Sequence, residues 1–169
     1  MRNGMYVPLG VALVVCAACG KQAEKSSSSS GQRGPAVSRT QLRQAPTSVT
    51  VQGLSLSLSA SLYRDFMMQP PGSEGGSPLV ASLRVSTADR RPIPGDVHVD
   101  RAWIMNGEEI WEPSDLVEKD RKDPSSVDAF EVTAHGGPKW VPGIDAEVVV
   151  ELRDGGRERH LLRQPAVRI

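Results

Sequence analysis

The chain has 169 residues, and its 20 basic and 20 acidic residues give a formal net charge of zero. This balance excludes the basic footprint that nucleic-acid binding requires, and it leaves no cationic helix for a membrane surface. The length favours one folded domain, and the 16 glycines and 13 prolines favour a turn-rich β protein over a helical one.

The N-terminus has the features of an export signal. Arg2 supplies a minimal positive region, and the apolar stretch Val7 to Ala18 follows it. This stretch is shorter than the roughly 20 residues that a helix needs to cross a bilayer. It has the length of a signal-peptide core and ends in small residues, as a cleavage site does. We therefore predict that residues 1–18 form a signal peptide.

The two cysteines of the chain, Cys16 and Cys19, end this stretch in the sequence Cys-Ala-Ala-Cys. A redox or zinc site with this spacing needs a folded scaffold or further ligands, and the leader offers neither. The segment instead resembles the lipobox of bacterial lipoproteins, in which a small residue precedes a cysteine that becomes acylated. The resemblance implies that Ala18 ends the signal, that Cys19 carries the lipid, and that the mature domain has no thiol. An uncleaved leader that serves as the anchor is the alternative.

Residues 19–46 are polar and rich in serine and glycine, and no apolar period runs through them. Such a composition buries too little apolar surface to offset the entropy of ordering, so we predict a disordered tether. In the lipoprotein resemblance, Gly20 after the cysteine is consistent with export to the outer membrane. We expect a protein held in the cell envelope by its lipid, at the outer membrane, facing the periplasm or the exterior.

From Thr47 onward apolar residues recur at every second position, which is the period of half-buried β-strands. The parity of this pattern changes across Gln52 and Gly53, which predicts a bulge or a strand switch at Gly53. The charged run 112–128 is expected to be a solvated loop. Further strands are expected around residues 79–85, 97–103, 110–111, 130–132, 148–152 and 161–167.

The Asn-Gly pair at 106–107 predicts a tight hairpin, because both residue types accept a positive φ. A two-residue loop there pairs Trp103 with Ile110. A four-residue loop instead pairs Ile104 with Trp111, and the sequence does not decide between the two registers.

The two glycines at 155–156 predict a second hairpin. Its expected register places Arg153 opposite Glu158 and Val150 opposite Leu161. Both pairs are favourable, because one joins opposite charges and the other joins apolar side chains.

About seven strands over residues 47–169, with turns between them, predict an all-β domain of two packed antiparallel sheets. The arrangement resembles an immunoglobulin-like or fibronectin-III-like β-sandwich. The resemblance is architectural, because the Cys–Trp–Cys signature of immunoglobulin domains is missing. We expect this sandwich to follow the signal peptide and the tether.

The domain lacks a cysteine nucleophile and the serine-hydrolase, zincin, phosphate-loop and Rossmann motifs. We therefore expect a non-catalytic protein without a cofactor. Its lipid anchor attaches it to the membrane, and its loops or a strand edge bind a protein or another envelope partner.

The sharpest candidate for chemistry is the alternating run from Asp96 to Asp100. In a strand, Asp96, His98 and Asp100 share one face with roughly 6.5–7 Å between neighbours. Carboxylate and imidazole ligands on one face can begin a metal site, so a metal-binding protein or a metal-dependent hydrolase is the alternative function. The plainer interpretation is that Val97 and Val99 enter the core and the polar residues form the wet face.

The segment from Tyr63 to Met68 precedes a loop of proline, glycine and polar residues. Tyrosine, arginine and methionine are common at recognition surfaces, so this segment is a candidate binding rim. The alternative is that its aromatic side chains plug the open end of the sandwich. A periplasmic inhibitor or chaperone-like domain is a third possible function of such a segment. The candidate partner-binding residues are Tyr63, Arg64, Phe66, Met67 and Trp111.

Overall fold

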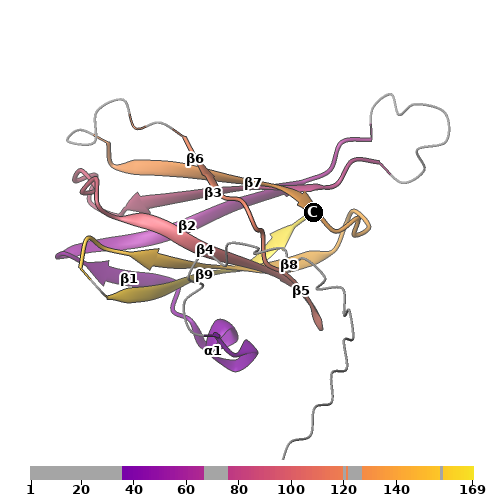
Figure 1. Ribbon diagram of the computed structural model, residues 1–169, viewed down its shortest axis with the longest axis horizontal. Coiled ribbons are helices and arrows are strands. Elements are labelled where there is room, and N and C mark those ends of the chain that lie inside the picture. Colours follow the sequence, from indigo (N-terminus) through magenta and orange to yellow (C-terminus); the bar gives the residue numbers. More distant parts are fainter. Residues whose placement is uncertain (1–35, 67–75, 120, 122–126, 157) are drawn as a thin grey trace, which may run out of the picture. The chain divides into compact units, whose positions relative to one another are not determined.

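Nine strands and one short helix make up the part of the chain that the computed structural model describes, residues 36–66, 76–119, 121, 127–156 and 158–169 (Figure 1). The described residues belong to the unit Ala36–Ile169. Cys19, Met67 and residues 19–35 of the predicted tether lie outside them. In chain order the elements are α1 (Arg39–Gln44), β1 (Ser48–Val51), β2 (Leu54–Tyr63), β3 (Leu79–Thr87), β4 (His98–Asn106), β5 (Glu109–Trp111), β6 (Val117–Glu118), β7 (Ala129–Gly137), β8 (Asp145–Arg153) and β9 (Arg159–Arg168).

The strands form two antiparallel sheets, which confirms the predicted all-β sandwich. The five-stranded sheet has the order β1-β2-β3-β7-β6, and the four-stranded sheet has the order β5-β4-β8-β9. The prediction of about seven strands is two short of the observed nine. It missed β6, which lies inside the charged run expected to be a loop, and the first predicted strand region is two strands, β1 and β2. Side chains from the inner faces of both sheets form the main core, among them Leu56, Leu83, Ile104, Val150 and Leu162.

Strand β2 shows why the period-two pattern was informative. Leu54, Leu56, Leu58 and Leu62 are buried, and the serines between them face outward or are half-buried. One face of the five-stranded sheet is therefore dry and the other is polar, which is the usual arrangement of an antiparallel sheet in a sandwich.

The turn at Gln52 and Gly53 replaces the predicted bulge. Val51 pairs directly with Leu54, so these two residues alone connect β1 to β2. Their φ angles are 49° and 77°, as a type I′ turn requires. Of the two predicted alternatives, the bulge was wrong, whereas the chain does pass from one strand to the next at Gly53. The parity changes because paired residues across a hairpin share one face. Val51 and Leu54 therefore both enter the core although their sequence parity differs.

The β4–β5 hairpin adopts the second of the two registers left open by the sequence. Ile104 pairs with Trp111, and Asn106 also pairs with Glu109, so the turn itself is Gly107 and Glu108. Gly107 has a φ of 58° at the first turn position. This register directs the Trp111 side chain to the inner face together with Ile104.

The β8–β9 hairpin differs from its predicted register by one residue. Val150 pairs with Leu162, and Arg153 pairs with Arg159. The prediction assumed a four-residue loop, whereas residues 154–158 separate the paired ends. As a result Leu162 is fully buried in the main core, and Leu161 lies on the opposite face of the sheet.

Helix α1 corrects the boundary of the predicted tether, because part of residues 19–46 is folded. Ser38 and Gln41 form a reciprocal capping box at its start. Leu42 is 1% exposed and packs against the four-stranded sheet. Val37 packs in the same cluster, as the residue before the cap does in a hydrophobic staple. The folded unit therefore begins about ten residues before the predicted start at Thr47.

The outer face of the four-stranded sheet carries a second apolar cluster under α1. Trp103, Met105 and Val149 are buried there together with Leu42 and Ala45. A register shift between Val99 and Arg101 changes the parity of β4. This shift directs Trp103 away from the main core, although Trp103 has the same odd-numbered parity as the core residue Val97.

Candidate binding surface

The chain that leaves β2 is held by hydrogen bonds to its neighbours. The Asp65 and Ser77 backbones are joined by a bond from Ser77 N to Asp65 O of 2.7 Å. Arg64 donates from Nε to the Ser77 carbonyl at 2.9 Å and from Nη1 to the Trp140 carbonyl at 2.6 Å. The end of β2, the start of β3 and the β7–β8 connection thus form one base.

Two aromatic residues at the end of β2 and just after it remain accessible. Tyr63 is 51% exposed and Phe66 is 50% exposed. The Phe66 ring packs over Gly76, and a Cβ added to Gly76 would lie 2.7 Å from the ring. The Arg64 guanidinium lies 4.8 Å from the centre of the same ring. Val141, which follows Trp140, is 66% exposed. We call Tyr63, Phe66 and Val141 the apolar rim.

The remaining candidate binding residues have other positions. Arg64 is half-buried and supports the rim through its bonds to backbone carbonyls. Trp111 is half-buried, and its ring lies against Gly137 and next to Leu79 of the five-stranded sheet. Trp111 therefore fills the space between the two sheets and is not part of the rim. Sequence reasoning missed Val141, because a single valine between Trp and Pro-Gly carries no pattern.

The three predicted metal ligands do not converge. Asp96 lies in a turn before β4 and accepts a hydrogen bond from Gln52 Nε2 at 3.2 Å. Asp100 lies in β4 and pairs with Arg153, with 3.0 Å between Oδ1 and Nη2. The run does not form one regular strand, because β4 begins only at His98 and its register shifts after Val99.

His98 belongs to a different interaction, which joins the sheets at the edge strand β6. Its Nδ1 lies 3.3 Å from Glu118 Oε2, and Glu118 Oε1 lies 2.7 Å from Arg121 Nε. The Arg121 guanidinium lies 3.8 Å above the centre of the Phe130 ring. It also donates to two backbone carbonyls before β4, at 3.1 and 2.5 Å. This network joins β4, β6 and the Phe130 side chain of β7, and His98 is part of it.

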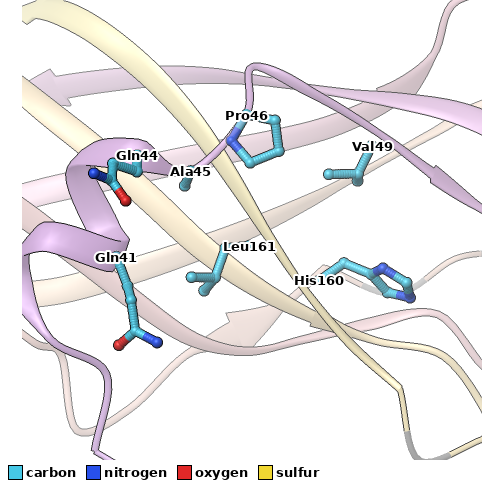
Figure 2. A pocket seen from close by; sticks show the side chains of 7 residues that line it. All are labelled: Gln41, Gln44, Ala45, Pro46, Val49, His160 and Leu161. Carbon is cyan, nitrogen blue, oxygen red and sulfur yellow. The ribbon is translucent and has the colours of Figure 1, made fainter.

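A groove of about 410 Å³ lies beside α1 (Figure 2). The Pro46 carbonyl at its edge accepts a hydrogen bond from Arg163 N at 2.8 Å, so this part of the β9 edge is already paired. Addition of a partner strand to this edge, one of the two predicted modes of binding, is therefore blocked at Arg163. The groove is lined by Gln41, Gln44, Ala45, Pro46, Val49, His160 and Leu161.

The six residues of α1 form the one helix among the described residues, and none of these residues forms a helix long and apolar enough to cross a bilayer. Among the described residues, the apolar rim and the groove beside α1 are the candidate surfaces for a partner. Comparison of the chain with models of protein families, with curated proteins and with solved structures finds no match.

Proposed function

We propose that this chain is a lipid-anchored binding module of the bacterial cell envelope, without catalytic activity of its own. The Cys-Ala-Ala-Cys sequence after an apolar leader supports an anchor at Cys19. The folded unit begins at Ala36, so residues 20–35 join the anchor to the sandwich. Attachment through a lipid keeps the sandwich near the membrane, and its surface is left to bind a partner.

The observation that carries the binding role is the apolar rim. Tyr63 and Phe66 are each about half exposed, yet Phe66 rests on a base fixed by hydrogen bonds from Arg64 and Asp65. Aromatic side chains are enriched at protein interfaces because they bury much area with few rotatable bonds. A rigid base lowers the entropy that binding costs, so this rim is suited to a protein partner.

The positions of the three candidate metal ligands favour the binding module over the alternative of a metal-dependent hydrolase or metal-binding protein. Asp96, His98 and Asp100 were its candidate residues, and each interacts with a different neighbour. A catalytic metal needs several ligands around one point and a free position for substrate. These three side chains do not supply such a point.

Replacing Cys19 with serine is expected to abolish fatty-acid labelling and to move the protein from the membrane fraction to the soluble fraction. The reason is that one thiol carries the anchor in this proposal, and serine does not take its place. Labelling with a radioactive or alkyne fatty acid, followed by membrane fractionation, measures both effects. Cys16→Ser is the matched control and should keep its label. Labelling that survives Cys19→Ser but disappears with Cys16→Ser contradicts the assignment.

Replacing Tyr63 and Phe66 together with serine is expected to weaken capture of the partner at least tenfold, since buried aromatic side chains dominate most interfaces. The wild-type protein and the variant are immobilised side by side and exposed to solubilised envelope proteins. Bound proteins are then compared by quantitative mass spectrometry. Val117→Ser is the control, because Val117 is 60% exposed on β6 and outside the rim. Equal capture by all three proteins refutes the role of the rim.

A further inference from the structure

The β8–β9 hairpin brings two carboxylates and an imidazole together. Asp154, Glu158 and His160 each offer a ligand atom, and these atoms lie within 4.8 Å of one another. His160 Nε2 is 3.9 Å from Glu158 Oε2. The grouping depends on the observed register, in which five residues separate Arg153 from its partner Arg159.

His160 carries a polar atom that its surroundings do not satisfy. It pairs with Leu152, whose side chain is fully buried, so the imidazole lies on the core-facing side at the margin of the sandwich. Its side chain is 21% exposed, and Nε2 is completely buried without a hydrogen-bond partner among the described residues. Buried polar atoms without a partner are rare in folded proteins, and a bound ion is one explanation for them.

The Nε2 end of the ring is directed toward Glu158, although the ring also lines the groove beside α1. In Figure 2 the His160 ring extends away from Leu161 and from the two glutamines. The 3.9 Å separation of Nε2 from Glu158 Oε2 locates this ring next to the hairpin loop. The imidazole therefore contributes to two surfaces, with its flank on the groove and Nε2 on the hairpin.

The two carboxylates are placed so that small movements complete a coordination shell. Asp154 Oδ1 accepts a hydrogen bond from Gly156 N at 3.1 Å, which fixes the orientation of this carboxylate. The Glu158 side chain is 80% exposed. Metal–ligand bonds of about 2.0–2.2 Å place neighbouring ligands of a tetrahedral ion about 3.4 Å apart. The 3.9 Å pair needs to close by about half an ångström, and no pair needs more than about 1.4 Å, because all three ligand atoms lie within 4.8 Å of one another.

We propose that Asp154, Glu158 and His160 bind a divalent transition-metal ion, with Zn²⁺ the best fit. An imidazole ligand favours zinc and its neighbours over Ca²⁺ and Mg²⁺, which prefer shells made only of oxygen. Three protein ligands leave a position for water or for a group from a partner. This site depends neither on the rim nor on the anchor, and it is distinct from the binding role proposed above.

Isothermal titration with ZnCl₂ tests the site. The full chain is used with Cys16→Ser and Cys19→Ser, so that no thiol competes for the metal. We expect one ion per chain. Glu158→Gln and His160→Gln should each weaken the affinity at least tenfold, and Zn²⁺ should raise the melting temperature of the parent more than that of either variant. Co²⁺ should give a visible absorption spectrum in the parent alone.

Two matched variants keep this test decisive. His98→Gln removes another exposed histidine and should leave zinc affinity unchanged, because His98 lies beside Glu118. Glu158→Gln changes a side chain that is 80% exposed, so the fold persists even where His160→Gln is unstable. The proposal is wrong if the parent binds no Zn²⁺, if Glu158→Gln binds as tightly as the parent, or if His98→Gln weakens binding equally.

Discussion

Replacing Trp103 with alanine is expected to lower the free energy of unfolding by about 3–5 kcal/mol. Trp103 is 3% exposed on the outer face of the four-stranded sheet, where it forms the floor under Leu42 of α1. The Arg101 guanidinium covers it 4.5 Å from the ring centre. Removing the indole leaves a cavity that the remaining side chains of this cluster are too few to fill.

Equilibrium urea unfolding measures the loss, and hydrogen exchange of the α1 amides shows whether the helix is released. Trp103→Phe is the control, since it keeps an aromatic ring in the cluster and should cost clearly less than alanine. Leu42→Ala removes the partner side chain from α1 and should release the helix while most of the sheet stays protected. If Trp103→Ala leaves the α1 amides protected, the indole is not what holds the helix.

Replacing Gly137 with alanine is expected to destabilise the sandwich by about 1–3 kcal/mol, although the substitution adds a single methyl group. A Cβ at this position would lie 2.7 Å from the Trp111 ring and 2.8 Å from Leu79 Cβ. Leu79 Cβ is fixed to the backbone of the neighbouring strand β3, so it cannot move away easily. The two sheets must therefore separate locally, or the indole must leave the position it occupies between them.

Trp111→Leu supplies the double-mutant test of this steric argument. The loss in the Gly137→Ala, Trp111→Leu protein should be smaller than the sum of the single losses, by about 0.5–3 kcal/mol. Gly136→Ala is the control, because Gly136 has a φ of 82° and open space around its Cβ position. Its cost comes from the backbone conformation, so it should add to that of Trp111→Leu without coupling. If the free-energy losses of Gly137→Ala and Trp111→Leu simply add in the double variant, the steric explanation is wrong.

The second apolar cluster and the proposed metal site show which features a single sequence leaves undetermined. The start of α1 has a local signal, since Ser38 and Gln41 match a capping box and Val37 and Leu42 match a staple. A six-residue helix is nevertheless too short to be stable alone. Its folding depends on the outer face of β4 and β8. Which residues of β4 point to that face is determined by a register shift for which the sequence carries no recognisable signal.

The sequence by itself determined the all-β class, the two-sheet architecture and the positions of the long strands. Alternation in β2 and β3 is sufficient for this, because the side chains of a strand point to opposite faces and the buried face must be apolar. It also singled out Tyr63 and Phe66, which the structure leaves half exposed.

Only the tertiary structure decided the pairing register of the strands and which polar side chains come together in one place. A shift of one residue in the β8–β9 hairpin exchanges Leu161 for Leu162 in the core, and it also determines which polar side chains meet at the hairpin. In the same way, the start and register shift of β4 separate Asp96 from Asp100, and the β8–β9 register brings Asp154 near His160. Spacing along the chain fixes neighbours within a strand, whereas loop length and bulges fix neighbours between strands, and a binding site needs both.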